Sequence, residues 1–249
     1  MVKLRLRRMS DIPKEFNEEY YNQSYYATPN GKAYSKSDGS IEHWGYKNPT
    51  GEWQGALSIV ESWALLFEPK KMLDVGCGRG TFIAYARDFE IEAEGFDFSE
   101  WAVTHPYTRC KPEWVRRHDA LKPWPYKDNQ FDFVIALDFF EHLYEPDIDQ
   151  VADELFRVSG KWIFLQIATV DGVKEKGYKL VKGEVAPLDV EVYAAAGHVT
   201  VQTPKYWTDK FEHYGLKLRP DLTKEFFNFA DADAVTNWKT NAILVYEKV

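Results

Sequence analysis

Residues 70–89, KKMLDVGCGRGTFIAYARDF, contain the pattern that decides the fold. The stretch at 70–75, with Met72, Leu73 and Val75, predicts a buried strand, and residues 81–89 have the spacing of a helix. Between them lie Gly76, Gly78 and Gly80. Glycine lets the backbone turn tightly and approach a ligand without an intervening side chain. The stretch therefore predicts a strand, a loop and a helix whose first N–H groups can face a negative group.

The alternation of strands and helices continues toward the C-terminus. We expect further strands at 91–97, 113–119, 131–138 and 160–169, and helices at 99–105, with Ser99 as the N-cap, and at 147–159. A helix at 203–215 then precedes strands at 216–222 and 241–248. These last two have little sequence between them for a crossover helix, so we expect them to pair antiparallel. The pattern predicts an α/β fold, a Rossmann-like doubly wound sheet of about seven strands with helices on both faces and an antiparallel C-terminal edge.

The N-terminal part of the chain has a different composition. Residues 11–52 are rich in Tyr, Asn, Gly and Ser, which is typical of turns and irregular structure. A helix is expected across 55–69, with its apolar positions at Leu57, Val60, Ala64 and Phe67. We interpret the 249 residues as one domain, with a cap or lid and lead-in helix at 1–68, a core at 69–249, and an insertion at 171–197 within that core.

Charge and cysteine content restrict the class of protein. The net charge of -8 argues against general coating of nucleic acid, so we interpret the basic residues Lys3, Arg5, Arg7 and Arg8 first as a solvated arm and second as a contact to RNA or phosphate. Two cysteines do not form a disulfide framework, and we find no membrane span or signal peptide. We expect a cytoplasmic monomer or homodimer that acts on a small molecule.

Acidic residues follow two of the expected strands. Asp97 ends the strand at 91–97, and Asp119 follows the strand at 113–119. In doubly wound sheets, ligands bind at the carboxyl ends of the strands, where a carboxylate can accept the hydroxyls of a ribose. A dinucleotide favours G-x-G-x-x-G near the start of the chain, whereas this loop reads G-x-G-x-G and begins after about seventy residues.

This arrangement resembles the class I S-adenosylmethionine-dependent methyltransferases, with closest similarity to small-molecule or sugar O-methyltransferases. The resemblance runs from Lys71 to Val249 and rests on the ordered motifs LDVGCGRGTF, GFDFS, HDA, FDFVIALDFFEHL and RVSGKWIFLQIA and on the two final strands. It implies S-adenosylmethionine as cofactor. By resemblance, the methionine part of the cofactor would contact Asp74, Gly76, Cys77, Gly78 and Gly80. The ribose would contact Asp97, and the adenine would contact Phe98, Asp119 and Ala120. Leu137 and Asp138 would line the path to the methyl group.

Three polar residues follow the apolar strand at 131–137. Asp138, Glu141 and His142 would share one face if the strand turned directly into a helix. One interpretation makes Asp138 a cofactor contact, Glu141 an acid at a helix N-terminus and His142 a catalytic base. The other rests on a resemblance to the metal-binding signature of ubiquinone-pathway and small-RNA methyltransferases, with His198 as the fourth ligand. We favour direct action by His142 and no metal.

The acceptor is the least determined part of the prediction. The segment GHVTVQTPKYWTDKFEHYGL resembles a region of methyltransferases that modify sugars and small polar metabolites, which makes His198 a candidate substrate contact. Aromatic side chains of the lid, which can stack on sugar faces, are further candidates: Tyr25, Tyr26, Trp44, Tyr46 and Trp53. The leading hypothesis is O-methylation of a small polar or glycan-like acceptor; the alternatives are RNA ribose 2′-O-methylation and a non-catalytic partner subunit.

Overall fold

The computed structural model describes residues 21–26, 32–35, 41–44, 53, 55–169, 198–235, 238 and 241–249. For 32–35 and 41–44 it describes the backbone alone, so the side chain of Trp44 is outside the description. The basic arm at residues 3–8, Tyr46 and the insertion at 171–197 also lie outside the described residues.

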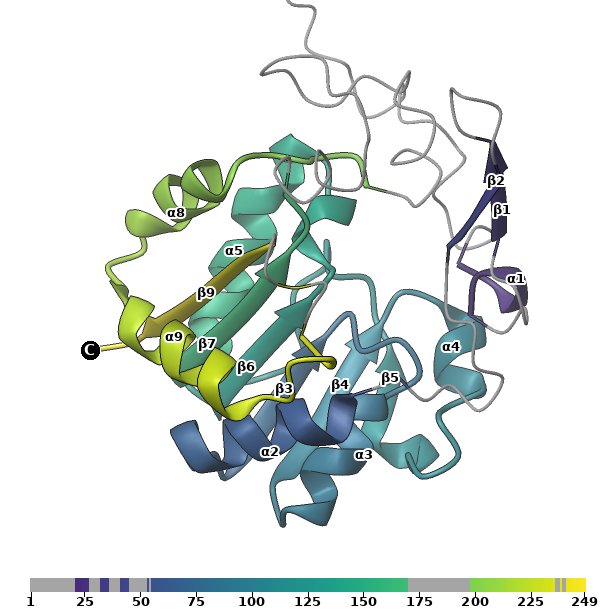
Figure 1. Ribbon diagram of the computed structural model, residues 1–249, viewed down its shortest axis with the longest axis horizontal. Helices are drawn as coiled ribbons and strands as arrows, with labels where there is room; N and C mark the ends of the chain where they lie inside the picture. Colours follow the sequence, from purple (N-terminus) through teal and green to yellow (C-terminus); the bar gives the residue numbers. More distant parts are fainter. Residues whose placement is uncertain are drawn as a thin grey trace, which may run out of the picture.

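A seven-stranded sheet forms the centre of the described chain, in the order β5-β4-β3-β6-β7-β9-β8 (Figure 1). The strands are β3 (Lys71–Val75), β4 (Glu92–Asp97), β5 (Val115–Arg117), β6 (Phe131–Leu137), β7 (Ser159–Ile167), β8 (Lys217–Leu218) and β9 (Ala242–Glu247). Strands β5, β4, β3, β6 and β7 pair in parallel, whereas β9 is antiparallel to both β7 and β8. The prediction of a Rossmann-like sheet with an antiparallel edge is confirmed.

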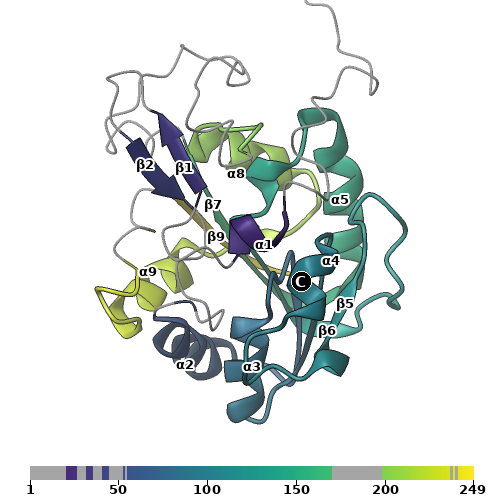
Figure 2. The same cartoon turned by 90° about the vertical axis from the view of Figure 1, so that its right-hand side faces the viewer.

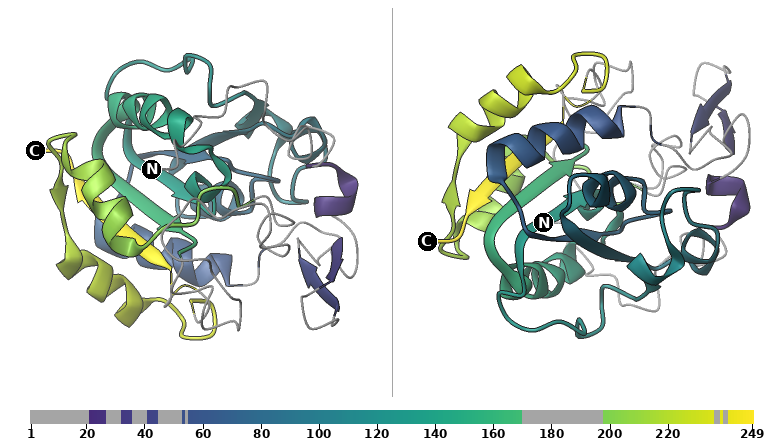
Figure 3. Two further views of the ribbon diagram at one scale, coloured as in Figure 1. Left: turned by 90° about the horizontal axis from the view of Figure 1, so that it is seen from above. Right: turned by 90° about the horizontal axis from the view of Figure 1, so that it is seen from below.

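Helices cover both faces of the sheet (Figures 2 and 3). The elements are α1 (Gln23–Tyr26), α2 (Ala56–Phe67), α3 (Thr81–Asp88), α4 (Glu100–Thr104), α5 (Glu145–Val158), α8 (Pro204–Glu212) and α9 (Pro220–Phe229), the 3-10 helices η3 (Pro112–Trp114) and η4 (Phe140–His142), and a separate hairpin of β1 (Lys32–Ser35) and β2 (Ile41–Trp44). Helices α2, α3 and α9 cover one face, and α5 and α8 cover the other. No helix in the described ranges is long and apolar enough to cross a membrane.

The alternation of side chains along β6 explains the two buried clusters. Phe133 and Ile135 pack with α2 and α3, whereas Val134 and Ala136 point to the opposite face and pack with α5. All four are fully buried. A strand buried on both faces is apolar at nearly every position, and burial of each large side chain stabilises the fold by about 1.5–3 kcal/mol.

Helix α2 corrects one detail of the sequence prediction. Leu57 was expected on the buried face, but its side chain is 49% exposed. The residues that face the core are instead Ala56, Ile59, Val60, Trp63 and Phe67. Trp63 contacts Phe133 and Phe164 in T-shaped geometry at centroid distances of 5.7 and 5.3 Å. The helix is therefore rotated to bury the larger aromatic side chain.

The predicted strand at 216–222 is also wrong over most of its length. Strand β8 ends at Leu218, and Pro220 opens α9, a helix of ten residues between the last two strands. Proline has no backbone N–H for a β-ladder and fits the first turn of a helix. Phe226, on α9, is fully buried and packs on Phe164 of β7. The antiparallel pairing of β8 with β9 is nevertheless confirmed.

Candidate functional site

The glycine loop joins β3 to α3 at the carboxyl edge of the parallel strands. Gly76, Gly78 and Gly80 have φ values of 75, 51 and 76°, a left-handed conformation that favours glycine. The N–H groups of Gly76 and Cys77 both donate to the carbonyl of Phe96 on β4, at 3.0 Å. A Cβ atom on Gly76 would lie 2.5 Å from the Phe139 ring. The loop conformation thus requires glycine at this position for both backbone and steric reasons.

Asp97 lies at the end of β4, directly beside the loop. Its Oδ2 accepts a hydrogen bond from the N–H of Gly78, and its Oδ1 accepts one from the N–H of Ser99, both at 2.8 Å. Tyr26 donates a further hydrogen bond to the carboxylate. Burial raises the pKa of Asp97 even though these donors oppose the shift. Ser99 caps α4 as predicted, since its side chain accepts a hydrogen bond from the N–H of Ala102.

Asp74, the last polar residue of β3, is 2% exposed, and its Oδ2 has no hydrogen-bond partner. Burial, with a further contribution from the charge of Asp97, raises the pKa of Asp74 from 3.8 to about 8. A buried carboxylate oxygen without a partner is costly unless a ligand supplies a donor or a positive charge. Asp74 is therefore placed to receive a cationic group.

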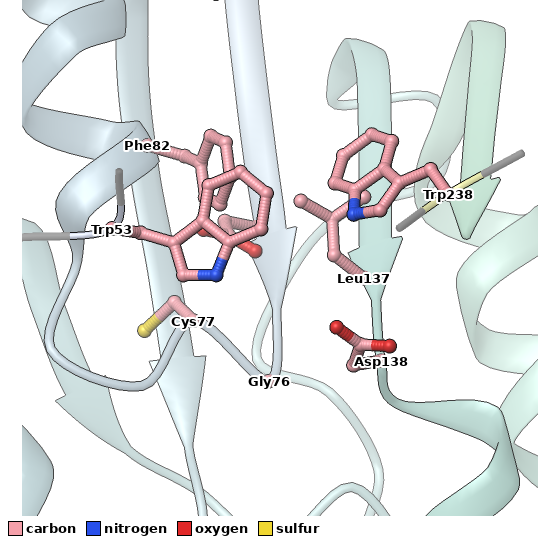
Figure 4. Close-up of a pocket in the computed structure, with 8 residues that line it drawn as sticks. Trp53, Gly76, Cys77, Phe82, Leu137, Asp138 and Trp238 are labelled. Carbon is pink, nitrogen blue, oxygen red and sulfur yellow. The ribbon is translucent and has the colours of Figure 1, made fainter. Parts of the chain in front are cut away.

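Asp74 is one of the residues that line a cavity at this edge of the sheet. Figure 4 shows a close-up of that cavity. Its lining residues are Trp53, Asp74, Gly76, Cys77, Phe82, Leu137, Asp138 and Trp238. Trp53 lies 5.4 Å from Phe82 and 5.5 Å from Trp238 between ring centroids. Figure 4 shows the two tryptophans on the walls, with the Gly76 loop and Asp138 below them. From its sequence context Trp53 was predicted only as a lid residue, and Phe82 and Trp238 were not predicted, because no local pattern connects them with the loop.

The polar residues after β6 do not form the continuous helix face that was expected. Asp138 has a φ of 46°, and only Phe140–His142 form the short helix η4 before α5 begins at Glu145. The Asp138 N–H donates to Oε1 of Gln166, whose Nε2 donates to Oδ1 of Asp138, both at 2.8 Å. This exchange with β7 holds Asp138 out of the helix and at the cavity wall.

Glu141, His142 and His198 come together in what we call the acid–histidine cluster. One potential ligand atom from each lies within 4.8 Å of the others, and Asp138 is not a member of this described group. The rings of His142 and His198 are perpendicular, with centroids 4.7 Å apart. The carbonyl of Glu141 accepts hydrogen bonds from the N–H groups of Val199 and Thr200 at 2.8 and 3.0 Å, which brings the segment from His198 onward to η4.

Glu141 lies in the first turn of the short helix η4 and is fully buried. Its Oε1 accepts the N–H of Ala168 at 2.9 Å, and its Oε2 is buried without a hydrogen-bond partner. Burial, followed by repulsion from Asp138, raises the pKa of Glu141 well above its usual value. His142 is half-buried, and its Nδ1 is 3.1 Å from the hydroxyl of Tyr21. No local pattern in the sequence indicates a role for Tyr21.

The remaining predicted residues line the same edge of the sheet. Ala120 is buried, and Asp119 is half-buried, with its Oδ1 accepting the N–H of Leu121 at 2.9 Å. Phe98 is 38% exposed and so is not a core residue. Cys77 is buried, and burial raises the pKa of its thiol, which suits an inert side chain. The roles assigned to these residues toward an adenine or a methyl group stay predictions.

Tyr25 and Tyr26, two of the predicted substrate contacts, lie in α1. Their rings are in T-shaped contact at 4.9 Å, and Tyr26 is buried against Trp101 of α4, parallel to it at 6.0 Å. The Tyr26 side chain also forms a hydrogen bond with Asp97, so it lies at the Asp97 side of the site. Its contact with an acceptor stays a prediction.

A Rossmann-like sheet with a glycine loop and an acid at the next strand end defines a nucleotide-type cofactor site. A family model described as a methyltransferase domain matches residues 56–220, and the chain belongs to this family. Its fold is the one found in class I S-adenosylmethionine-dependent methyltransferases.

Two curated relatives share part of the sequence. Norajmaline N-methyltransferase and ajmaline N-methyltransferase, both of Rauvolfia serpentina, are 32% and 31% identical to it over 99 residues. Each match covers 37% of this chain and 33% of the relative, so the chain matches about one third of the length of these curated relatives.

Solved structures share the fold. A SAM-dependent methyltransferase from Archaeoglobus fulgidus is 15% identical, with a TM-score of 0.55 over 77% of this chain and 92% of that one. Human N-acetylserotonin methyltransferase, in complex with SAM, is 15% identical, with a TM-score of 0.51 over 78% of this chain and 52% of that one.

The described residues fit the cofactor of this family. The cofactor carries an ammonium, a sulfonium and a ribose diol, and these groups call for carboxylates and a backbone that a ligand can approach closely. The buried, unpartnered Oδ2 of Asp74, the carboxylate of Asp97 and the glycine loop supply them. The assignment of each group to a residue belongs to the proposal that follows.

Proposed function

We propose that this methyltransferase transfers a methyl group from S-adenosylmethionine to a hydroxyl of a small polar or glycan-like acceptor. The observation that carries the proposal is the acid–histidine cluster, which lies one short turn from the carboxyl end of β6 and beside the cavity wall at Asp138. The class of reaction follows from the family, whereas the acceptor is inferred from the chemistry of the cluster.

In this proposal Asp74 receives the ammonium group of the cofactor, Asp97 the ribose, and Gly76 and Gly78 let the backbone approach it. When bound, the cofactor supplies a methyl group that is already activated by its sulfonium. The protein must therefore chiefly hold the acceptor in line and remove its proton. In this proposal the aromatic side chains of Trp53, Phe82 and Trp238, which line the cavity, exclude water from the place where the cofactor and the acceptor meet.

His142 acts as the general base in this proposal. When its Nδ1–H donates to the hydroxyl oxygen of Tyr21, its Nε2 is unprotonated and can take the proton of the acceptor hydroxyl. His198 packs perpendicular to the His142 ring and limits its rotation. As the acceptor hydroxyl is methylated, its proton moves to Nε2, and the resulting imidazolium lies near the carboxyl group of Glu141.

Two other acceptors have an observation in their favour. The two curated relatives are named as N-methyltransferases, which favours an amine. An amine that is already deprotonated needs only to be positioned, so its methylation would depend weakly on His142. RNA ribose methylation with a metal would instead use the acid–histidine cluster as ligands, because a carboxylate and two imidazoles suit a divalent transition metal.

A labelled transfer experiment distinguishes these acceptors. The protein is incubated with S-adenosylmethionine carrying a deuterated methyl group and with fractionated cell extract, and labelled products are located by mass analysis and fragmentation. The proposal expects a labelled O-methyl product with wild-type protein and little with H142A. A product labelled only on nitrogen, or one formed equally well by H142A, would overturn it. Loss of the label after treatment with ribonuclease would point to RNA.

A further inference from the structure

The short segment 21–26 contacts both ends of the proposed site. The hydroxyl of Tyr21 is hydrogen-bonded to Nδ1 of His142, and its backbone carbonyl accepts a hydrogen bond from Oγ of Ser99. Five residues later, Tyr26 donates to the carboxylate of Asp97. Figure 1 shows α1 beside α4, the helix that Ser99 caps. One segment is thus bonded to the proposed base and to the proposed ribose ligand.

The number of hydrogen bonds that Asp97 can accept limits how the Tyr26 contact and a bound ribose can coexist. A carboxylate has about four lone-pair positions for hydrogen bonds. The N–H groups of Gly78, Phe98 and Ser99 and the hydroxyl of Tyr26 already use all four of them. A ribose diol that donates both hydroxyls needs two. At least one existing donor must therefore leave when the ribose binds.

Tyr26 is the donor that can leave most readily. The other donors are backbone N–H groups: Gly78 N–H belongs to the glycine loop, and Ser99 N–H belongs to the residue that caps α4. Tyr26 reaches Asp97 only through its side chain, and a rotation of that side chain breaks the bond without disturbing the sheet. Its ring remains supported by Trp101, to which it is parallel.

We propose that Tyr21 and Tyr26 are positioning residues that couple cofactor binding to the placement of His142. The ribose displaces the Tyr26 hydroxyl from Asp97, the segment 21–26 moves, and the Tyr21 hydroxyl turns the His142 ring through the hydrogen bond that the two residues keep. The base then takes its working orientation only when the methyl donor is present. The proposal rests on the function proposed for His142, but its test uses neither an acceptor nor turnover.

The first test measures the affinity for S-adenosylhomocysteine by calorimetry. Y26F removes the competing hydroxyl and should tighten binding about two- to tenfold, the worth of one hydrogen bond of about 0.5–1.5 kcal/mol. Y214F is the matched control, because Tyr214 also donates to another element, the carbonyl of Asp149, at 3.2 Å. Its affinity should equal that of the wild type. Unchanged or weaker binding by Y26F would overturn the competition.

The second test follows the ¹⁵N resonances of the His142 imidazole by NMR. In the wild type, S-adenosylhomocysteine should shift the Nδ1 resonance as the geometry of the bond to Tyr21 changes. Y21F should lose most of that shift while still binding S-adenosylhomocysteine, and Y26F should show a much reduced shift because its segment is already released. If the His142 resonances of the wild type do not change when S-adenosylhomocysteine is added, the coupling is refuted.

The two tests separate this inference from the proposed function. If the His142 resonance responds as expected but H142A transfers methyl groups at the wild-type rate, the role of His142 as a base fails and the coupling stands. If H142A is inactive but the resonance does not respond, the coupling fails and the base role stands.

Discussion

The clearest physical prediction concerns the buried carboxyl of Asp74. Its pKa is about 8 in the folded chain, against 3.8 for a free carboxyl, because burial and then the charge of Asp97 disfavour ionisation. Between these two values the folded protein keeps a proton that the unfolded chain has released. Folding stability should therefore be highest below about pH 4 as far as this group is concerned and fall as the pH rises toward 8.

The size of the fall follows from the number of protons involved. One proton more in the folded state lowers the free energy of unfolding by about 1.4 kcal/mol per pH unit, or about 3 kcal/mol from pH 5 to pH 7. The variant D74N resembles the protonated acid and does not titrate. Its free energy of unfolding should lack this slope, so it should become more stable relative to the wild type as the pH rises.

Denaturation by urea at pH 5, 6 and 7 measures this difference directly. The control is D209N, which removes an exposed carboxylate on α8 that pairs with Lys205 at 2.7 Å. Its stability relative to wild type should change by less than about 0.5 kcal/mol over the same range. If D74N and wild type lose stability in parallel between pH 5 and 7, Asp74 is ionised in the folded protein and the reasoning from burial is refuted.

The remaining predictions address the site. If Asp74 receives the cofactor ammonium, binding of S-adenosylhomocysteine at pH 6–7 should release close to one proton, seen as a dependence of calorimetric heat on buffer ionisation; a heat independent of buffer would contradict this. G76A should destabilise the protein by about 1–3 kcal/mol more than G215A, because both positions have positive φ but only at Gly76 would a Cβ meet a side chain, Phe139; equal losses in thermal melts would show that the loop relaxes. H142A should lower the rate of transfer about 10²–10⁴-fold and change the affinity for S-adenosylhomocysteine little, and a loss of binding alone would point to a structural role. Activity should persist in EDTA with no divalent ion bound, whereas a chelator-sensitive activity restored by a metal would assign the acid–histidine cluster to metal binding.

Much of the fold could be predicted from sequence because its signals are local. The run from Lys71 to Asp88 specifies a strand, a glycine loop and a helix through residues that are neighbours in the chain, and Ser99 caps α4 through a bond to a residue three positions away. Parallel strands then bring their carboxyl ends to one edge, so the acids that follow them had to gather there.

The failures occurred where a local pattern had two solutions. Residues 216–222 alternate like a strand, but the chain ends β8 at Leu218 because Pro220 and the burial of Phe226 favour a helix. Leu57 has helical spacing, yet the larger Trp63 decides which face of α2 is buried. Packing against the sheet chose between these solutions, and packing is not visible in a short stretch of sequence.

The sequence by itself determined the class of fold, the cofactor loop and the acids at the strand ends, because hydrophobic periodicity and glycine spacing act over a few residues. Only the tertiary structure decided which residues surround the proposed chemistry. It brought His198 to Glu141 and His142, and Tyr21 to His142 across 121 positions of sequence. It also placed Trp53 against Trp238 in the cavity wall. Such contacts depend on how the folded sheet brings distant segments together, and the local preferences of a short stretch of sequence do not determine which distant segments meet.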